Sequence, residues 1–510
     1  MACTTSVTNC YTSGSNEPLP SLDRKSTMTL STKPTIVWFR TDLRLRDNPA
    51  FAAAAKSGCS VLPVFVLDNQ TAGVRPIGGA AQWWLHHSLQ SLAKDLSDFG
   101  LPLILRRGES ADVIADLVLE TDAEAVYWNR QYDAAATARD GAIKTALKES
   151  GVNGESFGGG LMAEPWTIKT KQGNYFKVYT PFWRAFCAAG GPKRPLGDAP
   201  VAAGPSTIPA SDLLGDWDLV SITPDWAAGF RDMWQPGESG AADRLTAFMD
   251  DVGSGYDGMR NFPAVVGTSG LSPHLHFGEI DPRRAWFAVY DRFGDDPGTE
   301  TFRKELVWRE FAHHVLFHVP DLPSQPMNQR FHRFPWRNDD AALRAWQRGQ
   351  TGYPIVDAGM RELWHTGTMH NRVRMVVASF LVKHLLLPWQ DGEAWFWDTL
   401  ADADLAANTF NWQWVSGCGA DAAPYFRIFN PQLQGEKFDK DGAYVRRWVP
   451  ELSNLPNKMI HAPWTAKPIE LQAAGVTLGK TYPAPIVDHK AARDRAMAAF
   501  KSLKKDDDAA

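Results

Sequence analysis

The chain has 510 residues, enough for more than one hydrophobic core at roughly 100–200 residues per domain. Its 53 Lys and Arg against 58 Asp and Glu give a formal charge of −5, which excludes a uniformly basic nucleic-acid coat but leaves room for a local basic groove. Five cysteines without CxxC spacing argue against a disulfide framework or a metal site, and no apolar run approaches the ~20 residues of a membrane span.

The first 165 residues predict a tail followed by an α/β domain. Residues 1–33 are rich in Ser, Thr and Asn without apolar periodicity, which predicts a disordered extension. Strand patterns then alternate with helical patterns at 35–40, 50–56, 61–67, 82–98, 101–105, 110–120, 125–128 and 136–149. This alternation predicts a doubly wound parallel sheet over 34–165, with its ligand at the carboxyl ends of the strands.

The rest of the chain predicts a linker and a helical domain. Residues 188–240 are loaded with Gly, Pro, Ala and Asp, which is typical of a connection between domains, and the interdomain linker is predicted over 166–240. Over 241–500 the patterns are helical, which predicts an all-α domain. Residues 501–510 end the chain in a charged tail.

Several helical-domain segments carry more polar and aromatic residues than a core needs. The loop 267–272 precedes Pro273 and a predicted helix, where hydroxyl and N–H groups suit either a phosphate or a plain N-cap. Glu305, Trp308 and Arg309 share one helix face, which suits a polar aromatic ligand or an ordinary Glu–Arg pair beside a packed Trp.

Two further clusters favour an organic, anionic ligand. Asn371, Arg372 and Arg374 lie in an apolar helix, where either arginine can contact phosphate or pair with a carboxylate. Asp402, Asp404 and Asn408 mark a turn and helix start, and without a histidine at ligand spacing they favour hydrogen bonds to an organic ligand over a metal. The 21 Trp fit base stacking or redox use of indole as well as core packing.

These segments together resemble the photolyase/cryptochrome family. The resemblance covers about residues 35–500 and rests on motifs that follow one another in the family order. They are WFRTDLRLRDN (38–48), TSGLSPHLHFG (268–278), WREF (308–311), GYPIVD (352–357), MHNR (369–372) and DADL (402–405).

The resemblance implies an antenna domain followed by a helical domain that binds a folded FAD. The Arg374–Asp402 ion pair would lie beside the isoalloxazine, with Asp404 and Asn408 at the ring edge and the loop 268–272 on the phosphates. The implied FAD residues are Tyr256, Thr268, Ser269, Gly270, Leu271, Ser272, Arg374, Asp402, Asp404 and Asn408.

It also implies a light-driven lyase that extrudes a cyclobutane pyrimidine dimer from UV-damaged DNA and opens it with an electron from reduced FAD. Implied catalytic residues are Glu305, Trp308, Met375, Asn408 and Trp414. Implied DNA contacts are Arg260, Glu305, Trp308, Arg309, Asn371, Arg372 and Gln434. The implied electron relay is Trp412, Trp389 and Trp336, with Trp346 as a branch.

Three positions favour the cyclobutane dimer within the family. Asn408 is a neutral amide where plant cryptochromes carry Asp, Met375 matches dimer photolyases, and Asn371 replaces the histidine that (6-4) repair requires. Residues 385–389 and 395–400 look closer to plant cryptochromes, a mixture that resembles class III photolyases. Phe302 and Thr368 stand where class I enzymes carry Trp. A photoreceptor that signals without repair is the alternative.

The remaining expectations concern the second chromophore and the setting. Asn129 and Asp133 match a folate-contacting Asn and acid, which favours methenyltetrahydrofolate as antenna over the alternative, a deazaflavin. A monomer in the cytoplasm, associated with the nucleoid of a bacterium and not with a membrane, is expected.

Overall fold

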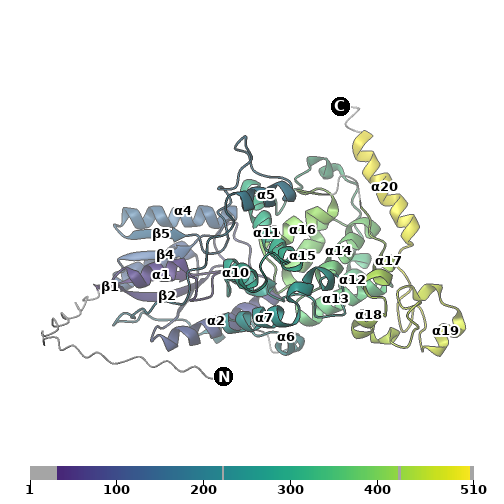
Figure 1. Ribbon diagram of the computed structural model, residues 1–510, viewed down its shortest axis with the longest axis horizontal. Helices are drawn as coiled ribbons and strands as arrows, with labels where there is room; N and C mark the ends of the chain where they lie inside the picture. The colour runs from purple at the N-terminus through teal and green to yellow at the C-terminus, as the bar shows by residue number, and fades with distance from the viewer. Residues whose placement is uncertain (1–30, 221–222, 423–426, 506–510) are drawn as a thin grey trace, which may run out of the picture.

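The computed structural model describes residues 31–220, 223–422 and 427–505, and it places an α/β layer beside a larger helical body (Figure 1). The strands form one parallel sheet in the order β3-β2-β1-β4-β5. Its elements are β1 (Ser31–Phe39), α1 (Pro49–Lys56), β2 (Cys59–Leu67), α2 (Gly79–Asp98), β3 (Ile104–Arg107), α3 (Ser110–Thr121), β4 (Ala125–Asn129), α4 (Ala134–Glu149) and β5 (Asn153–Phe157).

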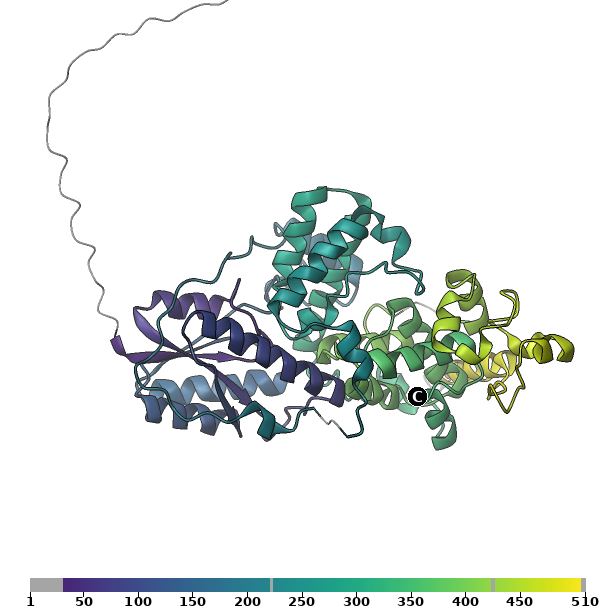
Figure 2. The ribbon, with the colours of Figure 1, turned by 90° about the horizontal axis from the view of Figure 1, so that it is seen from below.

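Helices cover both faces of this sheet (Figure 2), and the period of two along β1 explains why. Ile36 and Trp38 pack toward α3 and α4, whereas Val37 and Phe39 pack toward α1 and α2. A strand buried on both faces reads as a continuous apolar run, which is how residues 35–39 read in the sequence. The predicted doubly wound parallel sheet is therefore confirmed.

Two details of this domain differ from the prediction. Strand β5 was not predicted, because Asn153-Gly-Glu-Ser-Phe157 is polar and lies at the sheet edge, where one side remains in contact with water. Strand β1 begins at Ser31, inside the predicted extension 1–33. Residues 1–30 lie outside the described residues.

The predicted linker over 166–240 contains α5 (Tyr179–Ala188), a 3₁₀ turn η1 (Leu214–Trp217) and α6 (Ala228–Met233). Helix α5 buries Phe182 and Phe186, four residues apart, in the core of the helical domain. The linker prediction is wrong for this helix. A ten-residue helix is too short to dominate the composition of a stretch rich in Gly and Pro.

Beyond residue 237 the chain is helical among the described residues, as predicted. Its 3₁₀ turns are η2 (Gly253–Gly255), η3 (Gln329–Arg333), η5 (Pro450–Leu452) and η6 (Pro463–Thr465). Its longer elements are α7 (Glu238–Asp251), α8 (Tyr256–Met259), α9 (Ser272–His276), α10 (Pro282–Phe293), α11 (Pro297–His318), α12 (Asp340–Gln347), α13 (Pro354–Thr366), α14 (Asn371–Ser379), the π-helix η4 (Phe380–Leu385), α15 (Trp389–Thr399), α16 (Leu405–Ser416), α17 (Pro431–Phe438), α18 (Ala443–Trp448), α19 (Pro468–Ala473) and α20 (His489–Lys505).

Helix α20 runs into the predicted charged tail, since it continues to Lys505. It buries Leu503 against the large apolar cluster of the helical domain, so the tail prediction is wrong for residues 501–505. Residues 506–510 lie outside the described residues.

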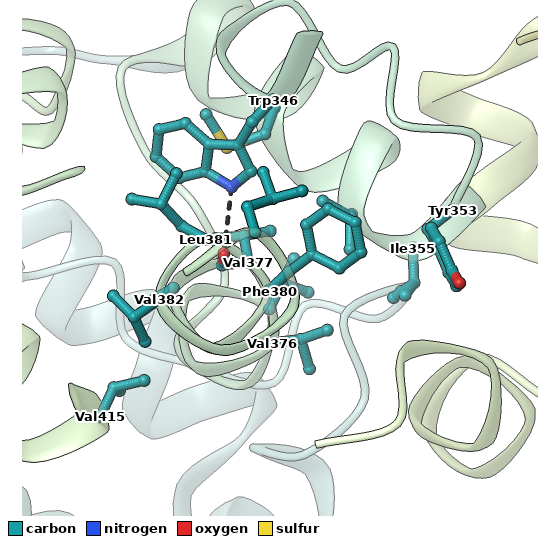
Figure 3. Packing of buried hydrophobic residues seen from close by; sticks show 14 of the residues in the cluster. Trp346, Tyr353, Ile355, Val376, Val377, Phe380, Leu381, Val382 and Val415 are labelled. Atoms are coloured by element: carbon teal, nitrogen blue, oxygen red, sulfur yellow. Dashed lines mark hydrogen bonds between the residues drawn. The ribbon is translucent and has the colours of Figure 1, made fainter. Parts of the chain in front are cut away.

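The largest apolar cluster fixes α12 against α14 and η4 (Figure 3). The indole N–H of Trp346 donates to the carbonyl of Val377 at 3.0 Å, while Phe380 and Leu381 pack nearby (Figure 3). A buried Trp brings a large apolar area and one N–H that needs a partner. This bond satisfies that need and fixes the orientation of the indole.

One buried arginine joins the two domains. Arg44 follows β1 and is 1% exposed. Its guanidinium donates to the carbonyls of Gly159 at 2.7 Å and Gly278 at 2.8 Å, and it lies 3.4 Å from the carboxylate of Asp281. Both Nη atoms of this buried guanidinium find acceptors, whereas its buried Nε has none among the described residues. The bonds of the Nη atoms set the position of the helical domain against the sheet.

We expect Arg44→Met to lower the free energy of unfolding by about 2–4 kcal/mol, because it leaves the buried carbonyls of Gly159 and Gly278 without this donor and removes one of the two guanidinium groups beside the buried Asp281 carboxylate, which keeps Arg283. Denaturant unfolding followed by tryptophan fluorescence measures the loss. Arg46→Met is the matched control, since Arg46 is 54% exposed and its ion pairs lie at the surface. Equal destabilisation by both changes would contradict the bridging role of Arg44.

Candidate active site

Helix α16 is the centre of the site. It packs against α11, α14 and α15, and its N-cap is Asp404, whose Oδ1 accepts from the backbone N–H of Ala407 at 2.7 Å. Asp404, Asn408 and Trp412 follow one another at four-residue spacing, so they lie along one face of the helix. The sequence prediction of a helix start at DADL is confirmed.

Arg374 of α14 reaches the chain just before α16. Its Nη2 lies 2.9 Å from Asp402 Oδ2, and its Nε donates to the carbonyl of Met369 at 2.7 Å. The predicted ion pair is therefore formed. The other oxygen, Asp402 Oδ1, is buried without a hydrogen-bond partner among the described residues. Such an acceptor fits a ligand that brings its own donor, as the ring N–H of a flavin does.

Asp404 faces two histidines. Its Oδ2 lies 3.4 Å from His313 Nε2 and 3.9 Å from His276 Nδ1. Burial raises the pKa of this carboxyl, but the charges and hydrogen bonds of His313 and His276 outweigh burial and hold the pKa well below its usual range. Asp404, His276 and His313 all line the cavity between the domains. The contact of Asp404 with the flavin edge stays a prediction.

Asn408 is buried and held from α15. Its Nδ2 donates to Glu393 Oε1 at 2.8 Å and to the Glu393 carbonyl at 3.1 Å. The same Glu393 oxygen pairs with Arg75 of the α/β domain at 2.7 Å. The Asn408 amide cannot act as an acid at neutral pH, and its NH₂ group already donates to Glu393. Asn408 is therefore suited to accept a hydrogen bond from a flavin and not to transfer a proton to it.

The predicted phosphate loop lies beside a cation that the sequence reasoning missed. Gly270 has a φ of +64°, and a Cβ there would lie 3.0 Å from Arg244 Nη1. The loop therefore needs glycine both for its backbone and for the close approach of this guanidinium. Tyr256 is buried next to it between Phe248 and Phe302, at ring distances of 5.6 and 5.7 Å.

Glu305 and Trp308 of α11 lie at the mouth of the site. Glu305 Oε1 accepts from Arg260 Nη1 at 2.6 Å, and both side chains remain partly exposed. The indole of Trp308 stacks on Tyr179, with ring centroids 3.6 Å apart and planes 8° apart. Tyr179 begins α5, so the sequence placed it in a linker and did not identify it. Its stacking is a long-range contact that no local pattern shows.

The structure corrects the prediction for Arg309. Its guanidinium donates to the carbonyl of Gly160 at 2.9 Å and lines the interdomain cavity. Arg309 therefore points away from the other residues that were predicted to contact DNA.

The other predicted DNA contacts lie together. Arg372 donates to Asn261, which follows Arg260 in the chain. The Arg372 guanidinium also lies 4.5 Å from the ring of Phe438, and Phe438 follows Gln434 by four residues on α17. Asn371 is exposed at the start of α14.

The predicted relay tryptophans share the largest apolar cluster. Trp412 and Trp389 are buried in it, and the partly exposed Trp336 packs against it. Trp412 lies 6.2 Å from Trp346 by ring centroids, with planes 72° apart, and 5.0 Å from Phe396. Phe396 is thus the nearer aromatic ring, and the branch residue Trp346 is an indole that also contacts Trp412. The order of electron transfer stays a prediction.

Met375 on α14 and Trp414 on α16 are half-buried. Phe302, one of the two departures from class I enzymes, packs on Tyr256 and Phe248. The other departure, Thr368, offers its Oγ1 at 3.4 Å from Arg374 Nη2. Both replacements therefore touch residues that are predicted to bind FAD.

A cavity of about 440 Å³ lies between the two domains. Asp133 lines it at the start of α4, but Asn129 does not. The Asn129 amide is 3% exposed and donates to Asp42 at 2.6 Å and Asn48 at 2.8 Å. The predicted folate contact of Asn129 is wrong, because its side chain is used to hold the loop after β1.

A further carboxyl near the Arg374–Asp402 pair was not predicted. Glu362 Oε2 of α13 accepts from the Tyr444 hydroxyl at 2.5 Å and from the backbone N–H of His370 at 3.4 Å. Burial raises the pKa of Glu362 to about 7, against the lowering effects of Tyr444, His370 and Arg374. Burial also lowers the pKa of His370 to about 4, so this histidine is neutral.

Comparisons with known proteins identify the family of the chain. The family described as DNA photolyase matches residues 35–202, and the family described as the FAD binding domain of DNA photolyase matches residues 302–502. A deoxyribodipyrimidine photo-lyase of Agrobacterium fabrum is 52% identical over 94% of this chain and 100% of that protein. Cryptochrome-1 of Arabidopsis thaliana is 39% identical over 92% of this chain and 70% of that protein.

A solved bacterial class III photolyase from Agrobacterium tumefaciens superposes with a TM-score of 0.90 at 51% identity, covering 95% of this chain and 100% of the other. The α/β layer, the helical body and the residues around α16 together define a two-domain FAD-binding flavoprotein. The chain belongs to the photolyase/cryptochrome family, and it is similar to class III photolyases, with plant cryptochromes as more distant relatives. Within 31–220, 223–422 and 427–505, no helix is long and apolar enough to span a membrane.

We expect Glu362→Gln to change the pH dependence of stability. The pKa of Glu362 is about 7 in the folded protein, against the usual 4.5. Between pH 4.5 and 7 the Glu362 carboxyl is therefore protonated in the folded state and ionised in the unfolded state. The contribution of Glu362 to stability is therefore full below about pH 4.5 and is lost as the pH rises through 7. Relative to Glu362→Gln, the unaltered protein should lose roughly 2–3 kcal/mol over this window.

Urea unfolding of both proteins at pH 5, 6, 7 and 8 measures this difference. Glu436→Gln, which removes an exposed carboxylate on α17, is the matched control and should shift all four values alike. A constant difference between Glu362→Gln and the unaltered protein would show that the Glu362 proton is not linked to folding.

Proposed function

We propose that this protein repairs cyclobutane pyrimidine dimers in UV-damaged DNA in a light-driven lyase reaction. The observation that carries the proposal is the mouth of the site, where the Arg260–Glu305 pair and the stacked Trp308 open next to the residues that fit a flavin. The relatives named photo-lyase support the same activity.

Each group at the mouth has a distinct task in this proposal. Trp308, held flat by Tyr179, offers an aromatic face on which an extruded dimer stacks, with Trp414 and Met375 as the facing wall. Glu305 hydrogen-bonds the dimer, and its orientation is fixed by Arg260. FAD, when bound and reduced, supplies the electron that opens the cyclobutane ring and receives it back.

Two features favour the cyclobutane dimer over a (6-4) photoproduct. Asn371 has no acid proton to give, and the neighbouring His370 is held neutral by burial, since its pKa is lowered to about 4. The ring Nδ1 of His370 also accepts the backbone N–H of Arg372 at 3.2 Å. Neither residue can act as the protonated acid that (6-4) repair needs.

A photoreceptor that signals without repair is the second candidate. It is favoured by the identity of 38–39% to plant cryptochromes and by the buried aromatic cluster around Trp412. Asn408 speaks against it, because its donor group is committed to Glu393 and it has no proton to deliver. The repair measurement below decides between the two.

We further propose that the interdomain cavity holds the antenna chromophore, a reduced folate such as methenyltetrahydrofolate. Its volume of about 440 Å³ suits one molecule of this size, and aromatic and cationic side chains line it. Trp38, Trp397, Arg107, Arg139 and Asp133 are among them. A deazaflavin is the alternative, and the absorbance of the chromophore released on denaturation distinguishes the two. A monomer in the cytoplasm, close to the nucleoid, remains our proposal for its setting.

Light-dependent loss of thymine dimers from irradiated DNA tests the repair activity. We expect the reduced, FAD-loaded protein to remove dimers under blue light and not in the dark. Glu305→Ala should lower repair per absorbed photon several-fold while dimer binding changes less, because the residue acts on the opened ring. Glu300→Ala, an exposed position on the same helix paired with Lys304, is the control. Bound, reduced FAD without repair would overturn the proposal.

Trp412→Phe should slow the photoreduction of oxidised FAD at least about tenfold, since it removes the indole closest to the candidate flavin along α16. Repair by protein already reduced with dithionite should be unaffected, because that step does not use the relay. Flash absorption and the dimer assay measure the two. Trp364→Phe, at an indole 56% exposed on α13, is the control. Equal loss of photoreduction and repair would contradict the relay role.

A further inference from the structure

Arg244 of α7 is a half-buried cation without a carboxylate partner among the described residues. Burial lowers its pKa, and within residues 31–220, 223–422 and 427–505 no carboxylate raises it. Arg260, the next arginine along the chain, differs, because Glu305 accepts from it at 2.6 Å. Removing a guanidinium from water costs free energy unless an opposite charge or hydrogen bonds compensate it. The uncompensated charge of Arg244 therefore indicates an anionic ligand.

The guanidinium of Arg244 is held in one orientation. Its central carbon lies 4.5 Å from the ring centroid of Trp234, and its Nη2 donates to the carbonyl of Met233. Trp234 is itself fixed, since its indole N–H donates to the carbonyl of Thr366 at 2.8 Å. A stacked guanidinium with one engaged nitrogen loses little side-chain entropy when a ligand binds to the other. This arrangement leaves Nη1 as the group that can meet a ligand.

The Nη1 atom lies at the loop 268–272. A Cβ on Gly270 would be 3.0 Å from it, so the loop backbone and the cation are immediate neighbours. Ser269 Oγ accepts from the backbone N–H of Leu271 at 3.3 Å, which leaves the hydroxyl proton of Ser269 to donate to a ligand. Two further hydroxyl residues of the loop are exposed, Thr268 and Ser272. Hydroxyl donors and a guanidinium together form the donor set that phosphate oxygens accept.

Helix α7 also connects Arg244 to a residue predicted to bind FAD. Arg244 lies one turn before Phe248 on this helix. The buried ring of Phe248 packs on Tyr256 at a centroid distance of 5.6 Å. The same helix therefore positions the cation and supports Tyr256.

We propose that Arg244, together with the hydroxyl groups of the loop 268–272, binds the diphosphate of FAD. The chain contains the FAD binding domain of its family, and FAD is a dinucleotide whose two halves are joined by an anionic diphosphate. Riboflavin has no diphosphate, so the cation gains nothing from it. Arg244 is thus a residue that selects the dinucleotide. The inference rests on FAD binding and not on DNA repair.

Titration of the full-length protein, stripped of flavin, with FAD and with riboflavin tests the proposal, and flavin fluorescence follows the binding. We expect Arg244→Gln to weaken FAD binding roughly tenfold to a hundredfold, since it removes a charge-assisted hydrogen bond. Riboflavin binding should change less than about twofold. Added KCl should weaken FAD binding by the unaltered protein more than by the variant, because salt screens the charged contact.

Two further variants serve as controls. Arg244→Lys keeps the charge, so its FAD affinity should lie between the other two and should retain the salt dependence. Arg231→Gln removes an arginine of the neighbouring α6, whose side chain is 48% exposed and pairs with Asp225. It should leave both affinities unchanged. Melting temperatures of the flavin-free proteins show that the variants are folded.

Two outcomes overturn the assignment of Arg244: an unchanged FAD affinity of Arg244→Gln, or an equal loss of affinity for FAD and riboflavin. Weaker DNA binding with unchanged FAD affinity would assign the cation to the DNA backbone instead. The repair function is judged separately on the unaltered protein. FAD binding without light-dependent repair would defeat the repair function and leave the role of Arg244 intact, whereas an unaltered protein that binds no FAD would defeat both.

Discussion

The buried guanidinium of Arg44 is the interaction on which the arrangement of the site depends. Arg44 follows β1 in the α/β domain, and its guanidinium contacts the Gly278 carbonyl and the Asp281 carboxylate of the helical domain. Gly278 approaches so closely that a Cβ would lie 2.2 Å from the Thr41 carbonyl. The segment between the phosphate loop and α10 is thereby fixed against the sheet, and with it His276, which faces Asp404.

A second bridge reaches the site from the other side. Arg75 of the α/β domain pairs with Glu393, and the same carboxylate holds the amide of Asn408. The α/β domain therefore does more than enclose a cavity. His276 faces Asp404, and Glu393 holds Asn408. Through these two contacts the α/β domain sets the orientation of two residues on successive turns of α16. A charged network of this kind keeps its geometry only when every member has a partner, so the interface and the flavin face are structurally coupled.

The sequence predicted those parts of the molecule that depend on local pattern. The parallel sheet followed from runs of apolar residues, and α16 followed from the cap and spacing at Asp404 and Asn408. It did not predict Tyr179, Arg244 or Glu362, because their roles arise from contacts between segments distant in the chain. Asn129 and Arg309 were assigned by resemblance alone, and both are used in packing, where a polar side chain satisfies buried backbone or carboxylate groups.

The charge distribution explains how a chain with a net charge of −5 can accept a polyanion. Many of its carboxylates are paired with arginine or lysine, whereas Arg260 and Arg427 lie near Arg372. Burial, and then the charges of these two arginines, lower the pKa of Arg372. Glu305 compensates Arg260 there and is positioned by it. Phosphate groups would relieve the remaining repulsion, so binding energy is concentrated where the lesion enters. In the proposed repair function, neutral or apolar groups (Asn408, Trp308, Met375) lie next to the reacting ring, where a bound charge would be expensive to desolvate.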